Sequence, residues 1–415
     1  MIQTEILATG DEIRSGALVD TNSAWLARRL ESCGLSVRRH ECVGDDLEDL
    51  VRVITEMSRR AEVVLVTGGL GPTPDDVSAQ AAAQALGVNL ELRPEALEQI
   101  KAFFQALGRE MPESNRRQAM LPQGADLLPN LVGTAPGFCC RLNASRLYFL
   151  PGVPWEMRRM YTDCVQPDLS SCFQDRLRPT ITRTLSTFGR TESATADALQ
   201  DFNHQFPDLD LGFRAHFPEI QVKLTVSGQG REVHNVLDRA TTWVRDRLGE
   251  SVFSCSEQHM AEVVQELLGN RFCTLAVAES CTGGLISHWL TEVPGSSDVF
   301  TLSAVTYANA AKERILGVNP QTLAEHGAVS EPVAREMAQG VRQAGGSDLG
   351  LATTGIAGPS GGSEAKPVGT LCIGLAGPTK ITAHRLHFRF PSRNANKKIF
   401  AMSALDLLRR HLENQ

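Results

Sequence analysis

The sequence predicts an α/β protein in which two three-layer α/β domains are joined by a small α+β domain. Apolar, strand-like runs alternate with amphipathic helical segments over residues 1–170 and again over residues 255–415. Residues 175–250 differ, with alternating strands and two amphipathic helices but no obvious chemical motif. A chain of 415 residues is also too long for one ordinary domain. These observations place the three domains at the three ranges just given.

The first domain is expected to begin with an apolar strand that ends in a glycine turn and leads to a helix. Thr21 or Asn22 can cap that helix at its N-terminus. A later helix starts with Asp45 and Glu48 at capping-box-like spacing. The run EVVLVTGG is apolar enough to be a central strand of a parallel sheet. The expected strands are 4–10, 35–44, 62–69 and 146–150, and the expected helices are 21–34 and 47–57.

The other two domains follow from the same periodicities. In the middle domain we expect strands 178–189 and 220–228 and helices 191–202 and 233–249. In the last domain we expect strands 272–279, 300–309, 347–355, 369–377 and 380–388. Its expected helices are 259–269, 283–293, 310–317, 332–345 and a final helix that runs to about Leu412.

The composition argues against several classes of function. The net charge is −7 and no dense block of Lys and Arg occurs, which argues against direct binding of nucleic acid or of a membrane surface. The ten cysteines are scattered without a Cys-x-x-Cys pair, so neither a zinc site nor a disulfide framework is expected. The N-terminus reads as a first strand and not as a signal peptide, and no apolar run approaches the ~20 residues that span a bilayer. We therefore expect a cytoplasmic protein.

The segment AESCTGG, residues 278–284, passes from a strand to a helix and holds several groups capable of acyl chemistry. Such a junction lies at the carboxyl end of a strand, where open α/β sheets bind ligands, and the helix N-terminus offers free N–H groups. Ser280 needs a base to act as a nucleophile, and Tyr307 and Lys312 follow at a strand end and a helix start. A lysine whose pKa is lowered by burial can deprotonate serine.

Other interpretations of these residues stay open on the sequence alone. Ser280 or Thr282 can simply cap the helix, with Lys312 as a solvated surface charge. Cys281 is intrinsically the better nucleophile, but no histidine obviously partners it. His288 follows about two turns along the next helix and can equally be a surface residue.

A glycine-rich loop, ATTGIAGPSGGSEAKPVGT, follows a later apolar strand. Backbone N–H groups in such loops hold phosphate or carboxylate groups, although a flexible surface loop is the alternative. The loop fits neither the Walker nor the dinucleotide-binding pattern, so a nucleoside triphosphatase or a Rossmann dehydrogenase is not predicted. Basic residues near the last helix can pair with a phosphate, although solvated charges are the default; they are Arg389, Arg393, Lys397 and Lys398.

Together, AESCTGG, VPGSSDVF, VTYANAAKERILGV, HGAVSEPVAREMA and TTGIAGPSGGSEAKPVGT resemble the C-terminal domain of the CinA family, the nicotinamide mononucleotide deamidase also called PncC. The resemblance implies hydrolysis of nicotinamide mononucleotide to nicotinate mononucleotide and ammonia, in pyridine nucleotide salvage and without a cofactor. It implies Ser280 as the nucleophile, with Tyr307 and Lys312 activating it. Where the family often has Gly-Asp-Arg, this chain has Pro391-Ser392-Arg393, which keeps the arginine only. The residues expected at the substrate are Cys281, Thr282, Gly283, Gly284, Thr354, Gly355, Gly358, Gly361 and Arg393.

The N-terminal domain carries a second candidate site in TGGLGPTPDDVSAQ. Gly68, Gly69 and Gly71 form a phosphate-sized loop, and Asp75 and Asp76 stand where the next helix is expected to start. Carboxylates beside an anion-binding loop indicate a divalent cation that bridges to phosphate oxygens. The alternative is that one aspartate caps the helix, which stabilises it by ~1 kcal/mol and needs no ligand.

These stretches, with ATGDEI and LPGVPWEM, resemble the N-terminal domain of the CinA family, which is similar to the MoaB/MogA molybdopterin-binding fold. The resemblance implies a metal-dependent ADP-ribose pyrophosphatase, with a non-catalytic nucleotide-binding or dimerisation module as the alternative. Where many members read Gly-Gln-Ile-Val-Asn-Thr-Asn, this chain reads GALVDTN. The expected pocket residues are Thr9, Gly10, Asp11, Glu12, Asn22, Gly68, Gly69, Gly71, Thr73 and Asn115, with Asp75 and Asp76 as metal ligands.

The middle segment, including FGRTES, resembles the small KH-like domain of the same family. It contains no Gly-x-x-Gly loop flanked by basic residues, so RNA binding is not expected. The resemblance to the CinA family also implies that the chain forms a homodimer. The ligands that it implies are small-molecule nucleotides.

Overall fold

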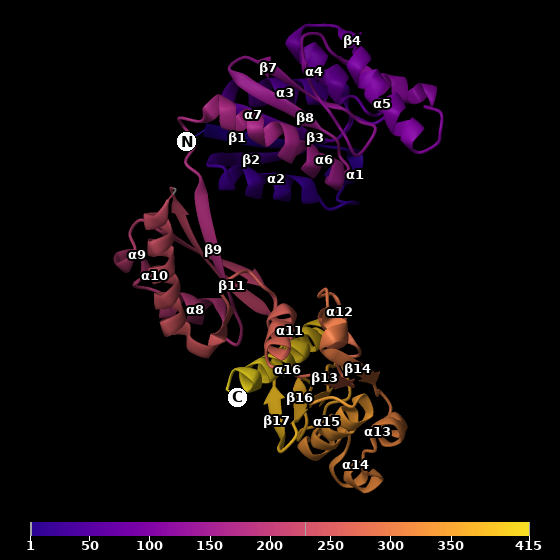
Figure 1. Ribbon diagram of the computed structural model, residues 1–415, viewed down its shortest axis with the longest axis vertical. Helices are drawn as coiled ribbons and strands as arrows, with labels where there is room; N and C mark the ends of the chain where they lie inside the picture. Colours follow the sequence, from indigo (N-terminus) through magenta and orange to yellow (C-terminus); the bar gives the residue numbers. More distant parts are fainter. Residues whose placement is uncertain (1, 229, 415) are drawn as a thin grey trace. The chain divides into compact units, whose positions relative to one another are not determined.

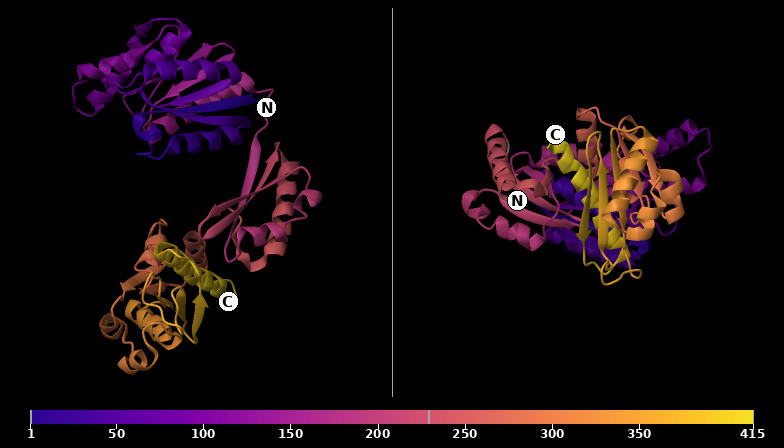
Figure 2. Two further views of the ribbon diagram at one scale, coloured as in Figure 1. Left: turned by 180° about the vertical axis from the view of Figure 1, so that it is seen from behind. Right: turned by 90° about the horizontal axis from the view of Figure 1, so that it is seen from below.

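The computed structural model describes residues 2–228 and 230–414. The chain forms two compact units (Figures 1 and 2). The first comprises Met1–Ile181 with Val226–Val233, and the second comprises Thr182–Thr225 with His234–Gln415. Both units contain sheets covered by helices, which confirms the predicted α/β class.

The first unit is built on a six-stranded sheet with the strand order β2-β1-β3-β8-β7-β6. The first four strands run parallel, and β7 and β6 continue the sheet in antiparallel fashion. Strand β3 lies centrally between β1 and β8, as its apolar sequence predicts. The bounds are β1 Ile2–Thr9, β2 Leu35–Val43, β3 Val63–Thr67, β6 Asp126–Leu128, β7 Gly137–Leu142 and β8 Ser145–Leu150.

Helices cover both faces of this sheet. Val64 of β3 packs in one apolar cluster with Leu50 of α3, whereas Val63 packs in another cluster with Leu26 of α2. Successive strand residues point to opposite faces, so the two clusters are the two sides of one three-layer domain. The helices are α1 Asp11–Arg14, α2 Thr21–Ser32, α3 Leu47–Arg60, α4 Ser78–Leu86, α5 Pro94–Ala106, α6 Pro154–Met160 and α7 Gln166–Phe173. Strands β4 Leu90–Leu92 and β5 Met120–Pro122, which lie on either side of α5 in the sequence, pair antiparallel in a separate two-stranded sheet.

Two predicted helix caps in this unit are wrong by one or two residues. The carboxylate of Asp20 accepts a hydrogen bond from the N–H of Ser23 and caps α2, in place of Thr21 or Asn22. Helix α3 is capped by Asp46, the neighbour of the predicted Asp45. Adjacent polar residues compete for a cap position, and the sequence alone does not decide between them.

The second unit begins with a small four-stranded sheet in the order β10-β11-β9-β12, the KH-like part of the chain. The sequence analysis missed β10, which is mostly exposed and lacks a regular apolar period. The elements are β9 Thr180–Thr187, α8 Glu192–Ala198, α9 Phe202–Gln205, β10 Asp210–His216, β11 Glu219–Ser227, α10 Arg231–Leu248 and β12 Val252–Ser254.

The rest of the second unit is a five-stranded sheet in the order β14-β13-β15-β16-β17. Helices α11, α12 and α16 lie in the apolar cluster of one face, and α13, α14 and α15 lie in the cluster of the other. This is again a three-layer domain. Its elements are α11 Met260–Asn270, β13 Leu275–Glu279, α12 Leu285–Thr291, β14 Phe300–Val305, α13 Asn309–Leu316, α14 Pro320–His326, α15 Glu331–Gly345, β15 Leu349–Gly355, β16 Thr370–Ala376, β17 Ile381–His387 and α16 Arg393–Glu413.

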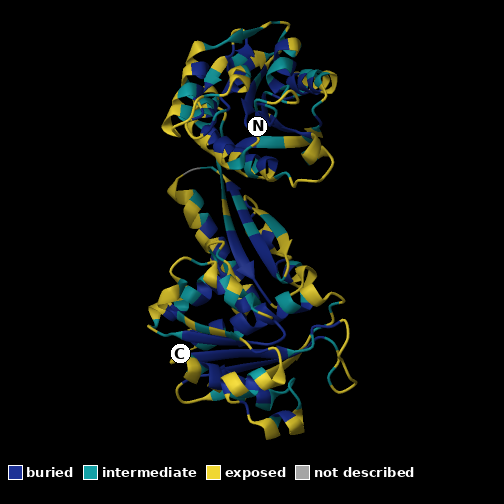
Figure 3. Ribbon diagram, turned by 90° about the vertical axis from the view of Figure 1, so that its right-hand side faces the viewer, coloured by how far each residue is buried: buried dark blue, intermediate teal, exposed yellow. Residues whose placement is uncertain are grey.

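The topology of this second sheet positions the candidate site. Strands β13 and β15 are parallel neighbours with Glu279 opposite Thr353, so the residues that follow them meet at one edge of the sheet. Strands β13, β15 and β16 are almost entirely buried, whereas β14 and β17 at the two edges of the sheet each carry exposed residues (Figure 3). Among the described residues, no helix is both long and apolar enough to cross a membrane.

Candidate active site

Ser280 and Lys312 are in direct contact at the edge of the five-stranded sheet of the second unit. Ser280 follows the last residue of β13, and Lys312 stands on α13. The Nζ of Lys312 donates to the Oγ of Ser280 at 3.2 Å and to the carbonyl oxygens of Thr306 and Tyr307 at 2.8 and 3.3 Å. Lys312 is only 1% exposed, so it is not the solvated surface charge of the alternative interpretation.

The surroundings of Lys312 shift its titration toward the neutral form. Burial lowers the pKa of its ammonium group below the ordinary value of 10.5. The hydroxyl and the two carbonyls that accept its hydrogen bonds are uncharged groups. A neutral amine beside a serine hydroxyl can accept the hydroxyl proton, which is the requirement for a Ser-Lys nucleophile.

Glu279 fixes the turn that carries Ser280, a role that the sequence analysis missed. Its side chain is fully buried, and its carboxylate accepts hydrogen bonds from the N–H groups of Gly284, Ile286 and Ser287 at 2.9, 3.2 and 2.9 Å. It also accepts one from the hydroxyl of Ser287 at 2.6 Å. An anion at the N-terminus of α12 satisfies the free amides there and is stabilised by the helix dipole. Glu279 therefore caps helix α12, a role for which Ser280 and Thr282 were the candidates from the sequence.

The backbone amides of Gly283 and Gly284, two of the four consecutive residues 281–284 expected at the substrate, are engaged within the turn. The N–H of Gly283 donates to the carbonyl of Ser280 at 3.2 Å, and the N–H of Gly284 donates to Glu279. In the described part of the chain, no oxygen atom accepts a hydrogen bond from the N–H of Cys281 or Thr282. These two amides are the donors left for an oxyanion.

Cys281 lies in surroundings that disfavour a thiolate. It is buried, and this burial raises the pKa of the thiol to about 12. A thiol must ionise to act as a strong nucleophile, so the environment argues against it. His288 is exposed on α12 and lies 3.5 Å from the carboxylate of Glu292, so it is not a partner of Cys281.

Tyr307 lies close to Lys312 through its backbone and not through its hydroxyl. Its side chain is exposed, and its hydroxyl accepts a hydrogen bond from Nη2 of Arg393 at 2.8 Å. The Nη1 of Arg393 donates to the carbonyl of Gly358 at 2.6 Å. Arg393 thus links the tyrosine to the glycine-rich loop, and Ser392, which replaces the aspartate of the family pattern, caps α16.

The glycine-rich loop between β15 and β16 lies beside the turn that carries Ser280. A side chain added at Gly355 would meet the sulfur of Cys281 at 3.2 Å, so the two segments are close. Thr354 is buried and donates its hydroxyl hydrogen to the carbonyl of Ala328 at 2.8 Å. Gly358 and Gly361 have positive φ angles of 79° and 89°, which side-chain-bearing residues rarely adopt.

Two further residues lie near this loop: Asn396, which was given no role from the sequence, and Lys397, one of the four basic residues expected to be able to pair with a phosphate. Asn396 is fully buried, and its amide donates to the carbonyls of Ala357 and Phe390 at 3.1 and 3.0 Å, which ties the loop to α16. Lys397 follows it, and a side chain added at Gly283 would lie 3.4 Å from its Nζ. Lys397 therefore brings a cation next to the turn that carries Ser280.

The first unit has a cavity of about 400 Å³ at the carboxyl ends of β1 and β3. Six carboxyl-bearing residues line it, half of them unpredicted. The predicted residues among its lining are Thr9, Gly10, Glu12, Asn22, Gly68, Gly69, Gly71, Asp75 and Asp76, and the lining carboxylates missed by the sequence analysis are Asp20, Asp45 and Glu156.

Three predicted residues lie outside the lining of this cavity. Asp11 pairs with Arg14 at 3.0 Å, and Asn115 donates its amide to Gln118 at 2.8 Å. Thr73 donates its N–H to Asp76 at 2.8 Å. A sequence position next to a glycine turn does not determine the direction of its side chain, which explains these misses.

The carboxylates suit a hard cation chemically, but they are not gathered as a ligand set. Burial, followed by the negative charges of Asp11, Glu12 and Asp75, raises the pKa of Asp45, and a cation would relieve that repulsion. One oxygen of Asp76 is already bound by Thr73. Within the described residues, the one group of three metal-ligating side chains that lie close together is in the other unit. Helix α4 starts at Ser78, so neither Asp75 nor Asp76 caps it.

Family models match three consecutive parts of the chain. A probable molybdopterin binding domain matches residues 5–171, a damage-inducible protein CinA KH domain matches residues 182–254, and a CinA C-terminal domain matches residues 257–412. A crystal structure of the protein CinA, of unknown function, from Thermoplasma acidophilum is 31% identical and covers 40% of this chain and 96% of that chain, with a TM-score of 0.37.

Relatives of full length are also similar to the chain. A CinA-like protein from Desulfosudis oleivorans is 47% identical over 409 residues, which are 98% of this chain and 99% of that protein. A CinA-like protein from Desulforapulum autotrophicum is 46% identical over 416 residues, which are 99% of this chain and 98% of that protein. Because proteins of that name match it over nearly their whole lengths, the chain belongs to the CinA family.

Proposed function

We propose that the second unit is a nicotinamide-nucleotide amidohydrolase that converts nicotinamide mononucleotide and water to nicotinate mononucleotide and ammonia. The contact between the buried amine of Lys312 and the hydroxyl of Ser280, at 3.2 Å, is the observation that carries this proposal. The pyridine nucleotide substrate itself comes from the resemblance of the surrounding motifs to the family's deamidase domain.

In the proposed mechanism, the Oγ of Ser280 attacks the carboxamide carbon while neutral Lys312 takes the hydroxyl proton. The N–H groups of Cys281 and Thr282 donate to the oxyanion of the tetrahedral intermediate. Lys312 then returns the proton to the departing nitrogen, and ammonia leaves with an acyl-Ser280 ester behind it. Water, deprotonated by the same amine, hydrolyses the ester and restores the serine. Every proton transfer uses groups of this chain, and no cofactor is required.

The phosphate end of the substrate is assigned to the glycine-rich loop and its cations. Arg393 already spans from Gly358 to Tyr307, so its guanidinium lies along the loop. Lys397 lies next to Gly283. A phosphate between them would accept charge-assisted hydrogen bonds, which bind the substrate strongly and orient its ring toward Ser280.

The test is product identification with the full-length chain and no added metal. Nicotinamide mononucleotide should give ammonia and nicotinate mononucleotide in equal amounts, and nicotinamide riboside, which lacks the phosphate, should react far more slowly. Release of free nicotinamide, which signals cleavage of the glycosidic bond, or no product at all would contradict the proposal.

We propose a second activity for the first unit, a pyrophosphatase that acts on ADP-ribose. The cavity of about 400 Å³, with a glycine loop facing several carboxylates, favours it. The expected metal ligands Asp75 and Asp76 line this cavity together with Glu12 and Asp45, and a divalent cation attracted by these carboxylates would neutralise the charge on the pyrophosphate. Gly68 and Gly69, whose φ angles are positive, would let the phosphates approach the backbone.

Full-length Ser280→Ala protein separates this activity from the first one. It should release AMP from ADP-ribose in the presence of Mg²⁺ or Mn²⁺, and Asp45→Asn should reduce that release. Calorimetry that detects ADP-ribose binding without any AMP would instead support the non-catalytic binding module and would contradict the pyrophosphatase.

A further inference from the structure

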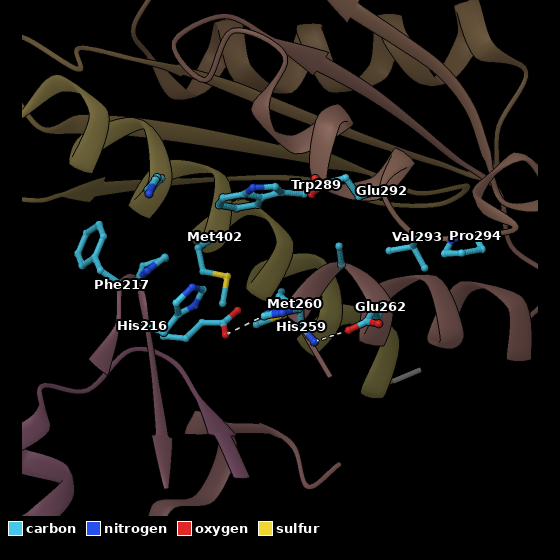
Figure 4. A pocket seen from close by; sticks show the side chains of 14 residues that line it. His216, Phe217, His259, Met260, Glu262, Trp289, Glu292, Val293, Pro294 and Met402 are labelled. Carbon is cyan, nitrogen blue, oxygen red and sulfur yellow. Dashed lines mark hydrogen bonds and ion pairs between the residues drawn. The ribbon is translucent and has the colours of Figure 1, made fainter. Parts of the chain in front are cut away.

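A second cluster of chemically capable side chains lies in the second unit, away from Ser280. His216 is the last residue of β10 and Glu219 the first residue of β11, and the two are paired across the tight turn of this hairpin. His259 directly precedes α11 and approaches the same point from the C-terminal part of the unit (Figure 4). The three residues thus come from two segments that are far apart in the sequence.

The geometry of this cluster is that of an incomplete metal shell. One ligand atom from each of the three side chains lies within 4.8 Å of the others, and no other group of this kind occurs among the residues that the structure describes. The Nδ1 of His259 is 3.6 Å from Oε2 of Glu219. Ligands at the usual Zn–N and Zn–O distances of about 2.0–2.1 Å in a tetrahedron lie about 3.3 Å apart. Small side-chain rotations therefore bring all three atoms to bonding distance.

The burial of Glu219 is the independent sign that this position receives a cation. Glu219 is only 6% exposed, and its Oε2 accepts no hydrogen bond within the described residues. A buried carboxylate is costly unless a charge partner compensates it, and neutral imidazoles are the form that binds metals.

A cavity of about 360 Å³ adjoins the cluster. Trp289 and Met402 give it apolar walls, Glu292 lies beside Trp289, and Glu262 lies beside His259 (Figure 4). Lys398 also lines the cavity and brings a positive charge, which Glu262 and Glu292 oppose with two carboxylates in the same lining. Three protein ligands leave one tetrahedral position open toward this cavity, as in zinc sites that keep a water molecule.

We propose that His216, Glu219 and His259 bind one divalent transition-metal ion of the Zn²⁺ type, with a fourth position open to water. The ion joins the β10–β11 turn to the start of α11 and so fastens two parts of the second unit together. A zinc site was not expected from the sequence because the chain has no Cys-x-x-Cys pair, whereas these ligands are two histidines and a glutamate from separate segments.

The test uses the full-length chain after removal of metals with a chelator. Calorimetry should find one Zn²⁺ bound per chain, and added Zn²⁺ should raise the melting temperature. His216→Ala and Glu219→Gln should each weaken Zn²⁺ binding by about a hundredfold or more. Loss of a residue that only hydrogen-bonds to a metal ligand already costs about 10–100-fold in affinity. His204→Ala, which changes an exposed histidine of α9, is the matched control and should bind Zn²⁺ like the wild type.

Co²⁺ then identifies the ligands, because the chain also carries ten cysteines. The proposal predicts the d–d absorption of a tetrahedral nitrogen and oxygen site, lost in His216→Ala. Sulfur-to-metal charge-transfer bands, or binding that is the same in wild type and His216→Ala, would overturn it. Circular dichroism and deamidase activity verify that each variant is folded, since none of these residues touches the Ser280 site.

Discussion

The Nζ of Lys312 lies 3.2 Å from the Oγ of Ser280, although 32 positions separate the two residues in the sequence. The contact exists because β13 and β14 are parallel neighbours, so the turn after β13 and the helix after β14 meet at one edge of the sheet. The side chain of Lys312 is only 1% exposed, and its hydrogen bonds end on neutral oxygens. This relationship gives the most direct predictions.

The deamidase rate should rise with pH through the pKa of Lys312. Its neutral amine is the base, and burial places its pKa below 10.5, so the rising limb lies below that pH. Lys312→Arg keeps a cation that stays protonated at every accessible pH and should lower kcat/KM by about 10²–10⁴-fold at all of them. A pH–rate profile of wild type and variant measures this, and an active Lys312→Arg enzyme would remove Lys312 from the mechanism.

The same residue should make stability depend on pH. In the folded chain the pKa of Lys312 is below its unfolded value of 10.5, so between these two values the unfolded state binds more protons. The free energy of unfolding should therefore increase as the pH rises through that window. Lys312→Met should abolish this increase, which urea unfolding of both proteins from neutral pH to about pH 10 would measure. Parallel curves would show that Lys312 is protonated in the folded state.

Glu279→Gln should damage the turn that carries Ser280 without removing any reacting group. The amide can accept fewer of the four hydrogen bonds that the carboxylate accepts, and its NH₂ group would face backbone N–H groups. We expect a loss of about 2 kcal/mol in stability and a fall in kcat larger than any change in KM. Glu325→Gln changes an exposed glutamate of α14 and is the control. Normal kcat in Glu279→Gln would contradict a positioning role.

Tyr307→Phe tests whether the hydroxyl of Tyr307 supports substrate binding through Arg393 or activates Ser280. Its hydroxyl binds Arg393 and not Lys312, so its loss should raise the KM for nicotinamide mononucleotide and leave kcat nearly unchanged. Arg393→Ala should raise KM further, by about tenfold or more, because a charge-assisted hydrogen bond to the phosphate is lost. If Tyr307→Phe instead lowers kcat, then the hydroxyl takes part in activating Ser280, as the family resemblance implies.

The sequence predicted those features that depend on local patterns. The α/β class, the central position of β3 and the strand-to-helix junction at Ser280 all follow from apolar periodicity and glycine placement. Side-chain direction does not follow in this way, and Asp11 therefore turns to Arg14 instead of lining the cavity.

Contacts between distant segments were the other source of misses. Glu279 stands inside a recognised motif, but its role depends on the path of the following turn, which brings three amides onto its carboxylate. The pairing of His216 and Glu219 requires β10, a strand too exposed to be recognised from its sequence. Each miss therefore concerns a group whose function is set by the tertiary fold and not by its neighbours in the sequence.

The most direct test of the central claim is the turnover of nicotinamide mononucleotide by Ser280→Ala and by Cys281→Ala, measured as ammonia release beside the wild type. The two residues are adjacent, so the comparison controls for disturbance of the turn. The account predicts that Ser280→Ala loses turnover while Cys281→Ala retains most of it, because the thiol is buried and its pKa is raised to about 12. Retained activity in Ser280→Ala, with activity lost in Cys281→Ala, would contradict the account.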